Sequence, residues 1–269
     1  MTDELQNTKE YLFQDIKLTT MDNLLNETTF EEHIASYLAN SDLYNQRSSA
    51  QFDIEKLCDV EMLELFLRQQ PVLWAKLSKH FPGQETATVI REYNKRIDRG
   101  ESILTIMRKG FTVSGAKVKF CQFKPVLESE ETDNYRLYRA NRFSVVRQMR
   151  YSLGKDSGNE LDMCILLNGI PLFTFELKNE GTGQNYTHGI KQYKENRNPQ
   201  NRMLRNCLVH FVMDNQYVFM TTKLNGEETS FLPFNREAVN PPIEGEYPTA
   251  YMWQDILQAD SVLDILDNF

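Results

Sequence analysis

The sequence predicts an α/β sandwich, and three observations predict it. Apolar side chains recur at helical spacing over residues 29–110, strand-forming runs dominate residues 111–239, and Asn168-Gly169 separates two apolar runs. Asn-Gly between such runs is a strong signal for a β-hairpin. Helices, an antiparallel hairpin, another helix and further strands follow the order of an α/β sandwich.

The first half of the chain is expected to be helical. Thr28 and Thr29 offer an N-cap for a first helix that begins near residue 29. Pro71 divides the next amphipathic stretch into two helices, because proline lacks the backbone N–H that a helix interior needs. We predict the following helices over residues 55–81, 86–99 and 102–107, with Gly110 after the last.

Alternating and apolar runs predict the strands of the second half. We expect strands over residues 116–123, 142–153, 161–167, 170–177, 208–213 and 217–221, and a helix over 186–195. Residues 1–25 are polar and form a separate segment, ahead of one domain over 26–239. Residues 240–269 combine a proline-rich linker with an amphipathic helix that needs a partner surface.

The hairpin around Asn168-Gly169 admits two registers. A plain two-residue turn pairs Asp162 with Phe175 and sends Glu176 to the opposite face. A three-residue loop over 167–169, with a bulge, pairs Asp162 with Thr174. The second register gathers four polar residues on one face, opposite an apolar one: Glu160, Asp162, Glu176 and Lys178. We predict this second register because it separates polar from apolar residues.

The polar face has the chemistry of a metal-dependent hydrolase. Mg²⁺ prefers oxygen ligands, commonly one or two carboxylates together with water and substrate phosphate. Asp162 and Glu176 supply carboxylates, and the backbone carbonyl of Leu177 offers a third ligand. Lys178 is placed to orient or deprotonate the attacking water and to offset charge on phosphorus. The alternative is an ordinary surface hairpin, because Glu-x-Lys alone is common.

An aspartate, thirteen residues and then Glu176-Leu177-Lys178 resembles the PD-(D/E)xK nuclease signature. More narrowly, the chain resembles the amino-terminal region of the type I restriction enzyme R (restriction) subunit. The segments that support this resemblance are residues 30–34, 141–148, 176–184 and 251–266. They occur in order along nearly the whole chain.

The resemblance implies a restriction-endonuclease-like fold, in which helices flank a mixed sheet. It also implies that Asp162, Glu176 and Lys178 have the family's catalytic roles. An acidic residue on an early helix often completes the site, and Glu31 is the best match. An acidic helix start is also a general dipole effect, so Glu31 has a second explanation.

Gln192 is a further candidate for contact with DNA or with the site. Many relatives have Gln-x-x-x-Tyr on the helix after the lysine strand. Here Gln192 and Tyr193 are adjacent, and Asn196 stands where that spacing requires tyrosine. The chain therefore departs from the family's pattern, and Tyr193 is equally consistent with packing.

The implied function is a Mg²⁺-dependent DNA endonuclease domain that hydrolyses phosphodiester bonds with a metal-activated water. In the family, modification and specificity subunits join the assembly, and motor domains of the same polypeptide translocate double-stranded DNA. This chain has no Gly-x-x-x-x-Gly-Lys-Ser/Thr loop, so ATP chemistry lies outside it. The alternatives are a catalytically silent nuclease-like docking module and, more weakly, a metal-dependent hydrolase acting on another nucleic acid.

Composition narrows these possibilities. The chain has 269 residues, 41% of them hydrophobic, and a net charge of -8, which opposes strong unaided DNA binding. Two basic runs flank the hairpin, and we expect DNA contact from one of them: Arg136, Arg139, Arg142, Arg147 and Arg150, then Lys191, Lys194, Arg197, Arg202 and Arg205. Four separated cysteines predict reduced thiols. Neither a membrane span nor a signal peptide is visible, so we expect a cytoplasmic protein.

Overall fold

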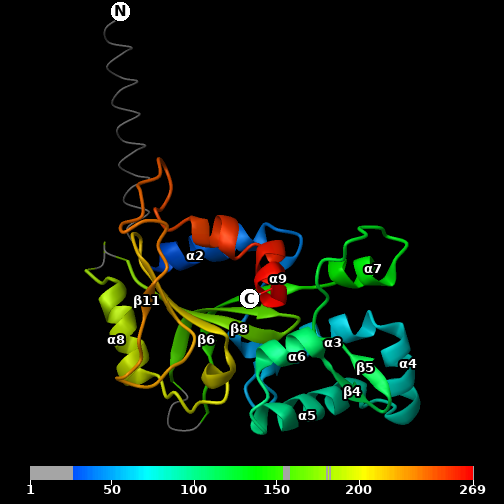
Figure 1. Ribbon diagram of the computed structural model, residues 1–269. Helices are drawn as coiled ribbons and strands as arrows, with labels where there is room; N and C mark the ends of the chain where they lie inside the picture. The colour runs from blue at the N-terminus through cyan, green and yellow to red at the C-terminus, as the bar shows by residue number, and fades with distance from the viewer. Residues whose placement is uncertain (1–26, 154–157, 180, 182, 269) are drawn as a thin grey trace, which may run out of the picture.

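The computed structural model describes residues 27–153, 158–179, 181 and 183–268, so the expected polar segment over 1–25 lies outside the described residues. A seven-stranded sheet forms the centre of the molecule (Figure 1), in the order β1-β6-β7-β8-β9-β10-β11. The strands are β1 (Tyr44–Arg47), β6 (Phe143–Arg150), β7 (Glu160–Leu167), β8 (Ile170–Leu177), β9 (Val209–Met213), β10 (Val218–Thr221) and β11 (Leu232–Pro233). The β1–β6 and β8–β9 pairs are parallel and the others antiparallel, which confirms the predicted mixed sheet.

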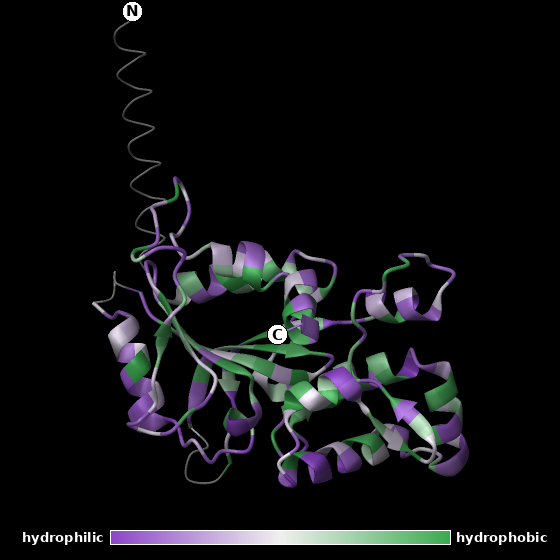
Figure 2. Ribbon diagram, in the orientation of Figure 1, coloured by the Kyte–Doolittle hydropathy of each residue, from purple (hydrophilic) through white to green (hydrophobic). Residues whose placement is uncertain are grey.

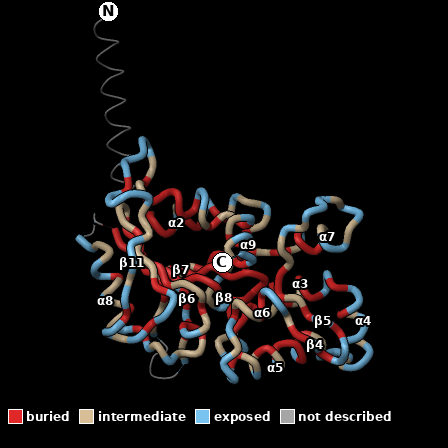
Figure 3. Tube along the Cα trace, in the orientation of Figure 1, coloured by how far each residue is buried: buried red, intermediate tan, exposed pale blue. Residues whose placement is uncertain are grey.

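Helices cover the sheet from opposite sides. Figure 1 shows α2 (Glu27–Ala39) above the sheet, beside the C-terminal segments η5 (Met252–Ile256) and α9 (Ala259–Asn268), and α8 (Tyr186–Asn196) below it. Every residue of β8 is buried (Figure 3), and Figure 2 shows apolar residues concentrated on the central strands. A strand buried on both faces is rigid, and β8 is the strand that leads to the candidate site.

The other helices predicted for the first half of the chain form a group beside the sheet. It comprises α3 (Val60–Arg68), α4 (Pro71–His80), α5 (Glu85–Asp98) and α6 (Ile103–Lys109), with short two-stranded pieces β2 (Phe52–Asp53) and β3 (Cys58–Asp59), and β4 (Phe111–Val113) and β5 (Ala116–Val118). Pro71 begins α4, and Gly110 follows α6 with φ 54°. Asp59 caps α3 by accepting a hydrogen bond from the backbone N–H of Met62.

Several local predictions were wrong. Helix α2 begins at Glu27, so Thr28 and Thr29 lie inside it instead of capping it. The strand expected over 116–123 ends at Val118, because it belongs to a short hairpin with β4. Helix α7 (Asp133–Arg139), capped by the Thr132 side chain, was not predicted. Strand β1, at the sheet edge, was not predicted.

The predicted hairpin register is also wrong. Leu167 pairs with Ile170, so the turn is the two-residue type that we had rejected. Asn168 and Gly169 both have positive φ, 49° and 81°, as a type I′ turn requires. The register then shifts between Leu166–Pro171 and Ile165–Phe173, which leaves one extra residue on β8, a β-bulge.

The bulge returns Asp162 and Glu176 to the same face of the hairpin. Beyond it, Cys164 pairs with Thr174 and Met163 with Phe175. Continuing that register by one residue places Asp162 opposite Glu176. The two carboxylates therefore share a face, as predicted, but by a tight turn and a bulge in place of a longer loop.

The turn itself is buried and holds two parts of the domain together. The Asn168 side chain accepts from the backbone N–H of Arg142 at 2.8 Å and donates to the carbonyl of Phe120 at 2.8 Å. The Gly169 carbonyl accepts from the backbone N–H of Asp59 at 2.8 Å. Sheet and helical group therefore meet at this turn, which fixes the end of the hairpin far from the polar residues.

The C-terminal amphipathic stretch finds its partner surface within the domain. Its buried residues include Met252, Trp253, Leu257, Val262, Leu263 and Leu266. Helix α9 contacts α6, and η5 contacts α2. None of the helices in the described residues combines the length and apolar character needed to cross a membrane.

Candidate active site

The candidate site lies where β7 and β8 part. The last pair of their ladder is Met163–Phe175, and Asp162, Glu176 and Lys178 follow just beyond it. On the other side, β9 continues beside β8 as far as Leu177, and the backbone N–H of Lys178 donates to the carbonyl of Met213 at 2.8 Å. Strand β8 thus stays paired with β9 at the point where its ladder with β7 ends, beside the two carboxylates.

Asp162 and Lys178 are in direct contact. Lys178 Nζ lies 3.1 Å from Asp162 Oδ2 and 3.0 Å from the backbone carbonyl of Leu177. The backbone N–H of Leu177 donates to the same Oδ2 at 2.7 Å. These bonds fix the orientation of the Asp162 carboxylate and occupy one of its two oxygens. Among the described residues, none donates a hydrogen bond to Oδ1.

Glu176 is fully buried and paired with Arg197. Arg197 Nε and Nη2 both reach Glu176 Oε1, at 2.8 and 2.7 Å, while Nη2 also donates to the Glu160 carbonyl. Glu176 Oε2 is buried and has no hydrogen-bond partner among the described residues. Burial and the nearby Asp162 carboxylate raise the pKa of Glu176 to about 8, and Arg197 partly opposes that shift.

Glu31, on α2, is held by two side chains of β6. Gln148 Nε2 donates to both Glu31 carboxylate oxygens, at 2.9 and 3.0 Å, and Arg147 Nε approaches Oε2 at 3.4 Å. Burial raises the pKa of Glu31, and the negative charge of Asp162 adds to the shift. Glu31 therefore lies within electrostatic range of Asp162 without bonding to it.

The backbone at Gln148 explains how two neighbouring side chains reach one carboxylate. Successive side chains of a strand normally point to opposite faces. Gln148 has φ 48°, a left-handed conformation that is uncommon outside glycine. This local twist of β6 directs both Arg147 and Gln148 toward Glu31. Strained backbone of this kind is frequent at functional sites.

Gln192 does not join these contacts. It lies half-exposed on α8, and no described residue hydrogen-bonds to its side chain. Helix α8 does pack closely on the site strand, since a Cβ added to Gly189 would lie 3.4 Å from the Glu176 Cβ. Tyr193 is fully buried and its hydroxyl lies 2.7 Å from Thr174 Oγ1, so it packs beneath the site.

Sequence reasoning missed two residues of this centre. Arg197 belonged to a basic run expected to be solvent-exposed or DNA-binding, yet it is buried against Glu176. Gln148 had no recognised role, because a left-handed strand residue leaves no trace in hydrophobic periodicity. The only available signal for Arg197 was its place directly after α8, where the chain turns back toward the sheet.

The donor set fits a hard divalent cation. The unpartnered Oε2 of Glu176, the Asp162 carboxylate and the Leu177 carbonyl are all oxygen ligands, which Mg²⁺ prefers. The described residues contain no group of three histidine, cysteine or acidic side chains arranged to hold a metal. A cation here would thus take two carboxylates and complete its shell with backbone oxygen, water and substrate, as Mg²⁺ commonly does.

The four cysteines follow the prediction made from their spacing. Cys58, Cys121, Cys164 and Cys207 are free and buried, and burial raises the pKa of each thiol. A buried thiol with a raised pKa is inert as a nucleophile. The four thiols are therefore not candidates for nucleophilic chemistry.

A comparison with protein families finds one match. The family model described as type I restriction enzyme R protein N terminus covers residues 25–229, which include all the site residues described above. A search of curated proteins found no match to the chain.

Proposed function

Since this chain belongs to the family of type I restriction enzyme R protein N termini, we propose that it is the Mg²⁺-dependent DNA endonuclease domain of such an enzyme. Its fold, a mixed sheet flanked by helices, is of the restriction-endonuclease-like class. The proposed reaction is hydrolysis of a phosphodiester bond by a metal-activated water.

One observation supports this proposal most strongly: a buried carboxylate oxygen without a partner lies beside a second carboxylate and an ammonium. An unpartnered buried carboxylate oxygen is costly, so such atoms call for an explanation. A cation ligated by Glu176 Oε2 and Asp162 provides one. Among the described residues, the surrounding bonds leave that oxygen available while fixing the rest of the group.

Each residue of the chain has a defined task in this proposal. Asp162, Glu176 and the Leu177 carbonyl hold the cation. When bound, Mg²⁺ polarises a phosphoryl oxygen and eases deprotonation of a water. Lys178 Nζ, anchored between Asp162 and the Leu177 carbonyl, places a positive charge beside the attacking water and the charge that develops on the phosphate. Glu31, held by Gln148, adds negative charge near the water.

The family name also supports a larger assembly. We propose that the domain works with modification and specificity subunits in the cytoplasm, on double-stranded DNA that motor domains of the same polypeptide move at the expense of ATP. Recognition and translocation then lie outside this chain. The net charge of -8 is consistent with that division, since a weak intrinsic affinity for DNA would leave the choice of substrate to the partners.

Calorimetry with Mg²⁺ or Mn²⁺ tests the metal site on this chain. We expect Asp162→Ala and Glu176→Ala to lose at least about tenfold in metal affinity, because each removes an oxygen ligand. Glu195→Ala is the matched control, since Glu195 is an exposed carboxylate on α8. Metal binding that survives both site substitutions would show that the ligands are misassigned.

DNA cleavage by the assembled enzyme tests the reaction. Lys178→Ala should abolish cutting while ATP hydrolysis continues, because the lysine acts only at the scissile phosphate. If cutting survives Asp162→Ala, Glu176→Ala and Lys178→Ala, the domain is not the nuclease and its role is docking.

A further inference from the structure

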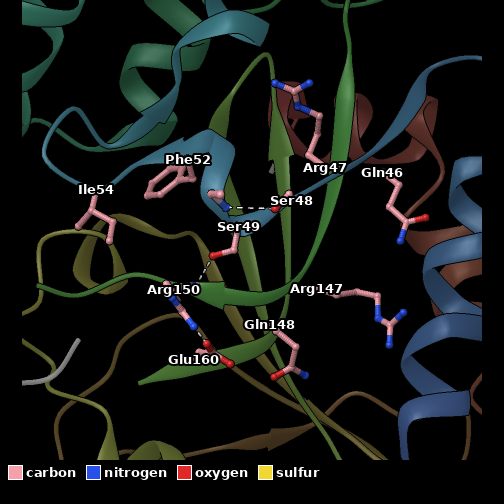
Figure 4. A pocket seen from close by; sticks show the side chains of 11 residues that line it. Gln46, Arg47, Ser48, Ser49, Phe52, Ile54, Arg147, Gln148, Arg150 and Glu160 are labelled. Carbon is pink, nitrogen blue, oxygen red and sulfur yellow. Dashed lines mark hydrogen bonds and ion pairs between the residues drawn. The ribbon is translucent and has the colours of Figure 1, made fainter. Parts of the chain in front are cut away.

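A hollow with several polar and charged side chains in its lining adjoins the candidate active site on its β6 side. It has a volume of about 600 Å³ and lies between β1, the short helix η1 (Ser49–Gln51) and the ends of β6 and β7 (Figure 4). The residues of its lining that matter here are Gln46, Ser48, Arg147, Gln148, Arg150 and Glu160. Most of these side chains are exposed, so a ligand can reach them.

The hollow shares residues with the catalytic centre at two points. Gln148 lines it and also holds Glu31, and Glu160 lines it while its carbonyl accepts from the arginine that binds Glu176. In the strand order β1-β6-β7, adjacent strands lie about 4.8 Å apart, so β1 is about 10 Å from β7, the strand of Asp162, measured across the sheet.

Two arginines of the hollow, Arg147 and Arg150, have N–H donors that no described residue binds. Arg147 and Arg150 are each tied to a carboxylate through Nε alone, to Glu31 and Glu160 respectively. Among the described residues, neither guanidinium uses its two Nη groups in a hydrogen bond. A guanidinium that offers two parallel N–H donors matches the geometry of phosphate.

Arg47, unlike Arg147 and Arg150, uses its guanidinium in several hydrogen bonds to carboxylates. It also borders the hollow, but Asp59 and Glu61 bind its guanidinium at 2.6 to 3.1 Å. Figure 4 shows Arg47 pointing away from Arg147 and Gln148. The parallel pairing of β1 with β6 explains this, because Arg47 pairs with Val146 and Gln46 with Val145. Gln46 therefore shares the face of Arg147, and Arg47 does not.

We propose that this hollow is a subsite for a DNA backbone phosphate adjacent to the scissile one. Arg147 Nη groups and the Gln46 amide bind the phosphate oxygens, and Arg150 adds positive charge at the outer rim. The Gln46 side chain is exposed and has no hydrogen-bond partner among the described residues. The inference rests on the proposed nuclease function and gives the DNA strand a path, from the carboxylates across β6 to the edge strand β1.

Binding of a short labelled DNA duplex, measured by fluorescence anisotropy over a range of KCl concentrations with Ca²⁺ present, tests the subsite. Arg147→Gln should weaken binding about tenfold at low salt. It should also reduce the slope of log affinity against log salt by about 1, because one phosphate contact is lost. Arg147→Lys keeps the charge and should keep the slope.

Arg68→Gln is the matched control, because it removes the same charge from an exposed arginine that Glu64 binds through Nε and Nη2 on α3. Thermal unfolding of each variant checks that it is folded. If Arg147→Gln and Arg68→Gln reduce the slope equally, or if the wild-type chain binds no duplex, the subsite is rejected.

The two proposals fail in different ways. An unchanged salt slope in Arg147→Gln, together with loss of cutting in Lys178→Ala, rejects the subsite and keeps the nuclease. A reduced slope, together with cutting that survives the active-site substitutions, keeps the DNA contact and rejects the catalytic assignment.

Discussion

At the scale of single residues, Arg197 determines which carboxylate oxygen of Glu176 is hydrogen-bonded. A glutamate with no exposed surface would normally be neutral, because burial penalises its charge. Arg197 binds only Oε1, so it partly opposes the rise in the pKa of Glu176 and, among the described residues, leaves Oε2 unpartnered. The ion pair thus stabilises the buried Glu176 side chain and fixes the orientation of its carboxyl group.

A double-mutant cycle tests this ion pair. We expect Arg197→Met to lower the free energy of unfolding by about 3 to 5 kcal/mol, because it leaves Glu176 buried without its cation. Glu176→Leu should lower the free energy of unfolding by a similar amount, because it leaves Arg197 buried without its carboxylate. The double variant should lose much less stability than the sum of the two single losses. Chemical denaturation measures all four proteins. Additive losses would contradict a direct energetic coupling.

At the scale of elements, the β7–β8 hairpin sets the geometry of the site through its turn and its bulge. The type I′ turn fixes one register, and the bulge shifts it by one residue. Without the bulge, the tight turn would point Asp162 and Glu176 to opposite faces. The buried turn is anchored to the helical group by Asp59 and Phe120, so slippage of the hairpin would break contacts at both ends.

Gly169 and Gly115 lie in similar hairpin turns, so alanine substitutions at the two positions distinguish the cost of backbone strain from the cost of a steric clash. Gly169 has φ 81°, and an added Cβ would lie 2.2 Å from the Asp59 carbonyl oxygen. Gly115, in the β4–β5 turn, has φ 73° with open space around it. We expect Gly115→Ala to destabilise by about 1 to 2 kcal/mol and Gly169→Ala by about 2 to 5 kcal/mol. Thermal unfolding gives both values, and equal losses would mean that the close approach at Gly169 has no cost.

At the scale of the whole molecule, the C-terminal segment belongs to the core. From the sequence, residues 240–269 are expected to combine a linker with an amphipathic helix that needs a partner surface. In the structure Val262, Leu263 and Leu266 are buried, and α9 packs on α6. The helix thus extends the core beyond the stretch that the family model covers, which ends at residue 229.

Unfolding experiments test whether α9 shares the cooperative transition of the domain. Leu266→Ala should cost about 2 to 5 kcal/mol through lost burial and a cavity, and should lower the denaturation midpoint without changing the slope of the transition. Asp264→Ala, on the exposed face of the same helix, should change stability by less than about 0.5 kcal/mol. A separate early transition for α9 would show that it is only loosely attached.

The sequence by itself located most of the main elements and the three hairpin residues of the candidate site. Periodicity located α3, α4, α5, α8 and the strands of the central hairpin, because helical and strand spacing follow directly from which side chains are apolar. It also placed Asp162, Glu176 and Lys178 near one another, because their separation spans a single hairpin. Short or local features, such as β1, β4 and α7, escaped this reasoning because few residues carry their pattern.

The tertiary structure alone decided the rest. A β-bulge and a left-handed Gln148 depend on how strands fit their neighbours, and neither changes the hydrophobic pattern. Burial of Arg197 against Glu176 joins residues from different elements, and its ion pair forms only once α8 has packed on the sheet. Sequence spacing predicts only local geometry, whereas these contacts arise from long-range packing. The final arrangement of the site therefore could not be predicted from the sequence.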